Sequence, residues 1–511
     1  MSKSSRVSVV FAGLVALVLG VSQVALAGGI VTQAQEQASG SSKAGSQTKS
    51  SKKKKKKKAA TTTFVVLGTY PSYPSQAPAA AQPITVTTVT APDSGLVPVA
   101  SQPAESVSRR TLTSSRVPGG VSGGPVTPPE ESPVTAGELV ISEFRVRGPN
   151  GANDEFIEIA NISGADHTVA GGGTGYAVAA SNGVARCVIP NGTVIPNRGH
   201  YLCVNSVGYS LASYPAGNGT TATGDATYTT DIPDNAGIAI FNTSIAGNFN
   251  LANRIDAVGS TSEANTLYKE GTGYPALTPF SISYSFYRDN CGKGGSITTF
   301  GACPTGGNLK DTNNNAADFV FVDTNGTSAG AGQRLGAPGP ENLSSPIERN
   351  ASFSVNLLDI CVAATSPPNR VRDFTSDSPN NSTFGTLDVR RTVVNNTGGN
   401  VTRLRFRIVD LTTFPAPSGI ADLRPRTSNA VVVTVDRPPC GSGTSNVTVN
   451  GTTLEQPPSQ PNGGGFNSSM SAGTVTLATP VANGASIDLR FLLGIQQTGS
   501  FKFFVNVEAL P

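Results

Sequence analysis

Short runs in which apolar and polar residues alternate begin near Glu138 and recur to the end of the chain. In the run 154–160, for example, Ile157 and Ile159 fall on one face and Phe156 and Glu158 on the other, which is the period of a β-strand. Gly, Asn, Asp and Pro separate the runs, and no long stretch has the apolar spacing of three and four that indicates a helix. The pattern predicts an all-β fold.

The runs form two blocks, 135–345 and 346–511, separated by a Pro- and Ser-rich stretch near 344–352. The expected strands of the first block lie at 138–146, 154–161, 175–180, 186–190, 200–204, 236–242, 254–259, 280–288 and 317–323. Those of the second lie at 386–396, 401–410, 430–436, 486–494 and 502–509, with a long loop at 451–469. Short strands at this spacing are typical of sandwiches. We therefore predict two immunoglobulin-like β-sandwich domains.

The segment 28–134 is rich in Ser, Thr, Ala, Gln and Pro and contains few large apolar residues. Such a segment buries too little apolar surface to offset its conformational entropy, so we expect a disordered stalk. Its most distinctive feature is an unbroken lysine run made of Lys52, Lys53, Lys54, Lys55, Lys56, Lys57 and Lys58. This run suits binding to an anionic polymer of the cell envelope, to an acidic surface or to nucleic acid; the alternative is a solvated spacer.

The first 27 residues have the pattern of an export signal. Lys3 and Arg6 precede an apolar run, and the sequence Ala-Leu-Ala at 25–27 matches a cleavage site. Cleavage would leave Gly28 as the mature N-terminus and no transmembrane segment. An uncleaved anchor is the alternative, because the run could just cross a bilayer.

Charge and cysteine content refine this picture. The formal net charge is +4, but eleven basic residues lie before Ala59. From Ala59 onward 26 basic residues stand against 32 acidic ones, a net of −6, which argues against nucleic-acid binding by the folded domains. Six cysteines follow the signal, an even number that favours disulfides in an oxidising compartment. Their grouping predicts the pairs Cys187–Cys203, Cys291–Cys303 and Cys361–Cys440.

The first block resembles the lamin tail domain in its exported bacterial form. The resemblance rests on the order of the segments 138–144, 153–161, 234–242, 254–259, 287–290, 313–321 and 335–342. It implies an immunoglobulin-like sandwich and no particular enzymatic activity, with bacterial members serving as accessory modules at the cell surface. Two departures are the absence of Trp and a long insertion at 208–230. The second block resembles surface-protein sandwiches only generically.

Catalytic chemistry has little support in the sequence. The two histidines, His167 and His200, are few for acid–base catalysis. Of the two G-x-S-x-G matches, 120–124 lies in the expected stalk, and 326–330 has neither the helix nor the downstream His of a nucleophile elbow. Glu155 and Glu158 alternate onto different faces of their expected strand, which does not suit a glycosidase pair. We therefore expect a protein without catalytic residues.

The best metal candidate consists of Asp311, Asn313, Asn315 and Asp318, whose side-chain oxygens recur as in the first half of a calcium loop. The turn glycine and terminal acidic ligand of such loops are missing, and Asx turns explain the same residues. Calcium therefore remains one interpretation beside a structural turn, and no other cofactor is expected.

Together these features predict a secreted or surface-attached, non-enzymatic binding or structural protein. Its expected partner is a protein or polysaccharide of the cell envelope. The alternatives are an accessory module of an extracellular hydrolase system and a calcium-dependent adhesin.

Overall fold

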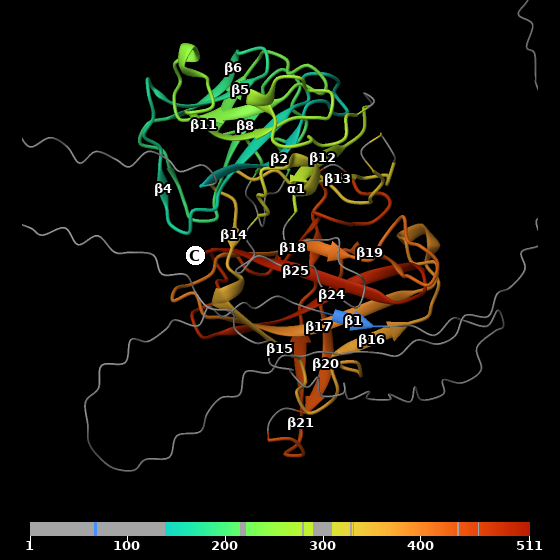
Figure 1. Ribbon diagram of the computed structural model, residues 1–511. Coiled ribbons are helices and arrows are strands. Elements are labelled where there is room, and N and C mark those ends of the chain that lie inside the picture. The colour runs from blue at the N-terminus through green and yellow to red at the C-terminus, as the bar shows by residue number, and fades with distance from the viewer. Residues whose placement is uncertain are drawn as a thin grey trace, which may run out of the picture.

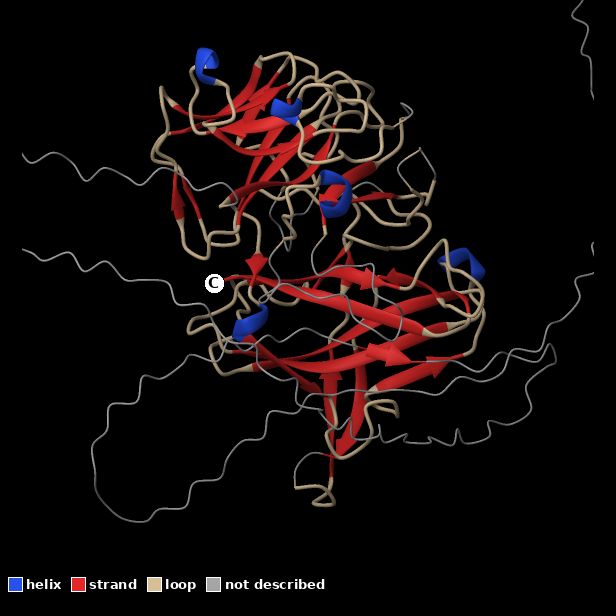
Figure 2. Ribbon diagram, in the orientation of Figure 1, coloured by secondary structure: helices blue, strands red, loops and turns tan. Residues whose placement is uncertain are grey.

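The structure is a computed structural model that describes residues 66–68, 138–214, 221–277, 281–289, 309–327, 330, 332–436, 439–457 and 459–511. Strands dominate the described residues (Figures 1 and 2). The helical elements are single turns: α1 (Asn315–Asp318), η1 (Ala246–Asn248), η2 (Thr266–Tyr268), η3 (Asn350–Ser352) and η4 (Ser378–Asn380). Among the described residues, no helix has the length and apolar character needed to cross a bilayer. The predicted all-β class is confirmed.

The first sandwich consists of two sheets. One has the order β13 (Phe319–Asp323), β12 (Tyr284–Arg288), β2 (Leu139–Arg145), β3 (Phe156–Asn161), β8 (His200–Asn205), β9 (Ala226–Tyr228). The other has the order β11 (Arg254–Val258), β10 (Ile238–Phe241), β5 (Gly175–Ala180), β6 (Ala185–Pro190), and β4 (His167–Thr168) pairs separately with β7 (Val194–Ile195). All neighbours are antiparallel except β8 and β9. These strands follow the predicted runs closely because each run alternates between a core face and an outer face.

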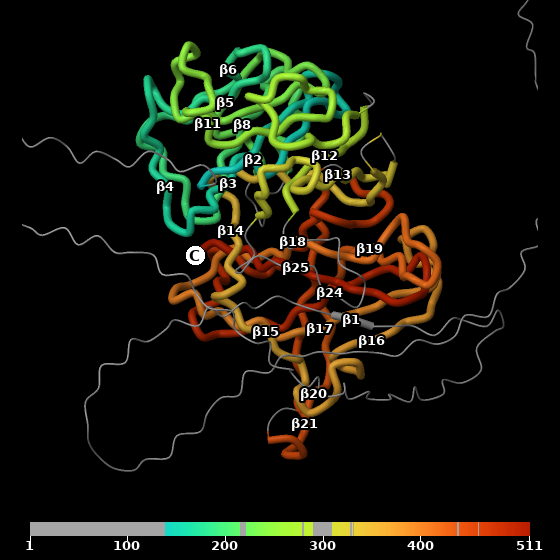
Figure 3. The backbone as a smooth tube through the Cα atoms, in the orientation of Figure 1, coloured from blue at the N-terminus to red at the C-terminus, as the bar shows by residue number. Residues whose placement is uncertain are grey.

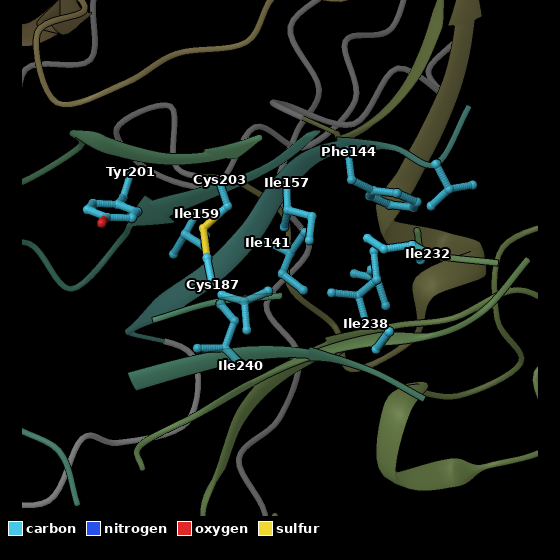
Figure 4. Packing of buried hydrophobic residues seen from close by; sticks show 14 of the residues in the cluster. Ile141, Phe144, Ile157, Ile159, Cys187, Tyr201, Cys203, Ile232, Ile238 and Ile240 are labelled. Carbon is cyan, nitrogen blue, oxygen red and sulfur yellow. A yellow bond between two sulfur atoms is a disulfide. The ribbon is translucent and has the colours of Figure 1, made fainter. Parts of the chain in front are cut away.

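Both sheets contribute to one core. Ile157 and Ile159 of β3 lie opposite Ile238 and Ile240 of β10 (Figure 4), and all four side chains are fully buried. The opposite face of β3 is buried as well, since Phe156 packs against the long insertion and Glu158 faces the second sandwich.

A disulfide joins the two sheets through this core. Cys187 on β6 is bonded to Cys203 on β8, as the sequence predicts, and both residues are buried (Figure 4). The crosslink therefore fixes one sheet against the other from inside the sandwich.

The second sandwich also has two sheets. One has the order β1 (Val66–Gly68), β25 (Phe501–Leu510), β18 (Arg403–Leu411), β23 (Ser469–Ser471), β22 (Thr453–Leu454), with β14 (Ile347–Glu348) also on β25. The other has the order β15 (Phe353–Leu357), β17 (Thr386–Asn395), β24 (Ser486–Gln497), β19 (Asp422–Arg426), with β16 (Arg370–Asp373) also on β17. Leu404 and Phe406 of β18 meet Leu489 and Phe491 of β24 in the core between them.

A hairpin of β20 (Val431–Asp436) and β21 (Thr444–Val449) projects from the second sandwich (Figure 1). The second predicted disulfide, Cys361–Cys440, ties the turn of this hairpin to the loop after β15.

Several sequence predictions lie outside the described residues: the export signal, the lysine run, and the pair Cys291–Cys303. Within the segment 28–134, the structure describes only β1, which extends the edge of β25. That short strand was not anticipated from the sequence.

Candidate functional site

The two sandwiches meet at a buried polar junction, where the cyan-green and orange-red parts of the chain come together (Figure 3). A cavity of about 70 Å³ lies within it. Titratable side chains from both domains gather there: Glu143, Glu158 and His200 from β2, β3 and β8, Glu341 from the connecting segment, and Arg405, Arg407 and Glu508 from β18 and β25. We take this junction as the candidate functional site.

The alternation of side chains along β18 places Arg405 and Arg407 at the junction. On β18, Leu404, Phe406 and Ile408 enter the core of the second sandwich, so Arg405 and Arg407 project from the opposite face. Glu508 is the direct cross-strand partner of Arg405 on β25. The pairing places opposite charges side by side, which stabilises neighbouring strands.

A β-bulge in β2 orients Glu143 toward the junction. The register between β2 and β3 shifts between Ile141 and Glu143, so that Ser142 and Glu143 both leave the core face while Ile141 and Phe144 stay in it. Bulges re-aim side chains in this way. The signal is visible in the sequence as two consecutive polar residues within an otherwise apolar run.

Two arginines and two glutamates form a closed ionic network. The Arg405 guanidinium contacts both Glu341 and Glu508. Arg407 reaches the same two carboxylates, with Nη2 3.3 Å from Glu341 Oε1 and Nε 3.2 Å from Glu508 Oε1. Although burial opposes it, Arg405 and Arg407 hold the pKa of Glu508 below its usual range. The network joins the connecting segment firmly to the second sandwich.

Two further glutamates lie opposite each other on neighbouring strands. Glu143 and Glu158 are a cross-strand pair, and each is only 3% exposed. Glu158 accepts hydrogen bonds from Ser142 Oγ at 2.5 Å and from the Glu341 amide at 2.6 Å, and Glu143 accepts one from the Gly339 amide at 3.0 Å. Burial raises the pKa of both carboxyls, and the Glu143 charge raises that of Glu158 further. These carboxyls therefore bind the first sandwich to the connecting segment.

His200 lies between Glu158 and Glu341. Its Nε2 is 3.8 Å from Glu158 Oε1 and its Nδ1 is 3.5 Å from Glu341 Oε2. Burial lowers the pKa of His200 to about 3, so the imidazole is neutral at physiological pH. An imidazole with that pKa is poorly matched to proton transfer near neutrality.

These three residues also offer ligand atoms within 4.8 Å of one another, which is the spacing of a metal centre. Glu158 is held by two hydrogen bonds and Glu341 by two arginines, so these carboxylates connect the two domains.

The four residues predicted as calcium ligands make different contacts in the structure. Asn315 is fully buried, and its side chain bonds Gly259, Glu270 and Ala257. Asp318 accepts hydrogen bonds from Thr312 and Asn314 at the start of α1. Asn313 is exposed with φ 55°, and its amide donates to Asp311 Oδ1 at 3.3 Å, as in an Asx turn.

Comparisons of the chain with protein-family models, with curated proteins and with solved structures find no match.

One buried carboxyl gives the protein a testable pH dependence. Glu155 is fully buried, and burial raises its pKa to about 8, although hydrogen bonds from Asn205 and the Ile232 amide oppose the rise. The folded chain therefore holds a proton that the unfolded chain releases above its ordinary pKa near 4.5. This stabilisation is complete below that value and is lost as the pH rises to about 8.

Replacing Glu155 with Gln removes this titration, so stability should fall less steeply with pH in E155Q than in the wild type. The expected difference in slope between pH 6.5 and 8 is up to about 1.4 kcal/mol per pH unit, the value for one proton. Urea unfolding at several pH values measures it. His200 titrates below this window in the folded chain and leaves the comparison intact. Equal slopes for the two proteins would contradict the prediction.

Proposed function

We propose that this chain is an exported, non-enzymatic binding or structural protein that acts at the cell surface or outside the cell. The observation that supports this proposal best is the disulfide Cys187–Cys203, which is enclosed in the core of the first sandwich. Disulfides form and persist in oxidising compartments. A buried disulfide therefore agrees with export of the chain, which the pattern of the first 27 residues predicts.

The resemblance to the lamin tail domain gives the proposal its class of protein. The segments that carry the resemblance include β2, β3, β10, β11 and β13, the strands that build the first sandwich. Fusing this sandwich to a second one through a buried ionic junction gives a stiff pair of domains, suited to a scaffold or to presenting loops to a partner.

The export part of the proposal is tested by expressing the whole chain with its own first 27 residues and fractionating the cells. The protein should leave the cytoplasm, and non-reducing peptide mapping should find Cys187–Cys203, Cys361–Cys440 and Cys291–Cys303. A cytoplasmic protein with free thiols at these positions would overturn the proposal.

The binding part places affinity for anionic envelope polymers in the lysine run. From Ala59 onward the chain is net negative, so deleting residues 43–58 should abolish adhesion to such polymers at low salt. Pelleting with isolated envelope polymer at increasing salt measures this, because binding through a polycation weakens steeply with salt.

The matched control deletes residues 84–99, an equally long segment without lysine, and should bind like the wild type. Adhesion that survives loss of residues 43–58 would instead make the lysine run a spacer and place the recognition surface on the sandwiches.

A further inference from the structure

A second cluster of carboxylates lies around Arg288, a residue that also lines the junction cavity. Asp256 on β11, Glu270 after η2 and Asp311 before α1 each offer one carboxylate oxygen, and these oxygens lie within 4.8 Å of one another. Asp256 and Glu270 are 1% and 5% exposed, whereas the Asp311 side chain is 16% exposed. The cluster is therefore buried on two sides and open to solvent at Asp311.

The fold holds these three segments in place through Asn315. Its Oδ1 accepts hydrogen bonds from the Gly259 amide at 2.9 Å and the Glu270 amide at 3.0 Å, and its Nδ2 donates to the Ala257 carbonyl at 2.9 Å. Asp318 in turn anchors the loop that carries Asp311. Two of the residues that the sequence offered as calcium ligands thus position a different set of carboxylates.

The cluster contains more carboxyl groups than guanidinium groups. Arg288 donates to both oxygens of Asp256, at 2.8 and 2.7 Å, and is 3.3 Å from Asp311 and 3.5 Å from Asp318. Arg254 contributes one contact of 3.3 Å to Glu270 Oε1. Lys310, the residue before Asp311, directs its ammonium to the carbonyl of Ala317. Four carboxylates therefore share two guanidinium groups.

An independent observation is the second oxygen of Glu270. This atom, Oε2, is buried and accepts no hydrogen bond from the described residues. A buried carboxylate oxygen without a donor is costly, and a bound cation supplies the missing partner.

We propose that Asp256, Glu270 and Asp311 form a divalent-cation site selective for calcium. Calcium binds hard oxygen ligands at 2.3–2.6 Å, so two ligands of one ion lie at most about 5 Å apart, which accommodates the observed spacing. Carboxylates drawn from a strand and two loops, with solvent access for water ligands, suit its irregular coordination better than the strict octahedron of magnesium. The ion would crosslink β11 to the two loops that cover it.

The test is thermal unfolding of the full mature chain after chelator treatment and dialysis, with calcium or magnesium chloride added back. Calcium should raise the Tm by roughly 5–10 °C once the free ion is about 100-fold above its Kd, and magnesium should raise it less. Titration calorimetry should find one bound calcium ion fewer in each of the variants Glu270→Gln and Asp311→Asn than in the wild type. Both variants should fold without calcium, since each replaces one carboxyl of a crowded cluster with an amide of nearly the same size.

Asn313→Gly is the matched control. It removes the side chain that a linear calcium loop would use and keeps the positive φ that glycine adopts freely, so it should retain the full shift. The proposal is overturned if the wild type shows no calcium-dependent shift, if Glu270→Gln keeps it, if magnesium matches calcium, or if Asn313→Gly loses it.

Discussion

Replacing Arg405 with Met should lower the free energy of unfolding by about 3–5 kcal/mol. The Arg405 side chain is fully buried, and its guanidinium lies between Glu341 and Glu508. Methionine keeps much of the apolar stem but leaves the two buried carboxylates with Arg407 as their shared cation. The penalty arises from those uncompensated charges. Urea denaturation of wild type and variant at pH 7 measures it.

The matched control is Arg147→Met, the same substitution at a salt bridge in partial contact with solvent. Arg147 and Asp234 are 26% and 25% exposed, so water solvates Asp234 when its partner is lost, and the cost should stay below about 1 kcal/mol. Adding Glu508→Gln to Arg405→Met should recover part of the lost stability, because it removes one unpaired charge. Equal losses for the two methionine variants would show that burial does not strengthen the junction.

The strands could be predicted from the sequence because alternation reports the core face directly. The run 401–410 predicts the strand that the structure shows as β18, and Leu404, Phe406 and Ile408 do enter the core. The same alternation does not show whether the opposite face of the strand contacts solvent or another domain. Arg405 and Arg407 read as solvent-facing polar residues, yet they are buried against another domain. Only the packing of one sandwich on the other decides between these outcomes.

The candidate sites were harder to predict for a related reason. Asp311 and its neighbours attract attention because they are close in sequence, but local spacing cannot show that Asn315 and Asp318 are occupied by hydrogen bonds of the fold. Asp256 and Glu270 come from distant segments and form no motif with Asp311. The disulfide pairing was easier to predict, because Cys361 and Cys440 are the only cysteines in the last third of the sequence.

Removing the disulfide Cys361–Cys440 in the double variant Cys361→Ala and Cys440→Ala should lower the free energy of unfolding by about 4–5 kcal/mol. The two cysteines are 79 residues apart, so the bond restricts a long loop in the unfolded chain, and this restriction grows with loop length. Cys440 is exposed, so its replacement leaves no large core cavity. Urea unfolding of the oxidised wild type and the variant gives the difference.

The buried pair provides the comparison. Cys187 and Cys203 are 16 residues apart, so the loop contribution lost in Cys187→Ala with Cys203→Ala is smaller, about 3 kcal/mol, but two cavities in the core add to it. Reductant should also distinguish the bonds, cleaving Cys361–Cys440 in the folded protein while the enclosed Cys187–Cys203 reacts only after unfolding. If removing Cys361–Cys440 costs less than about 1 kcal/mol, the hairpin must be held instead by the packing of Leu358 against Val435 and Val449 of its own strands.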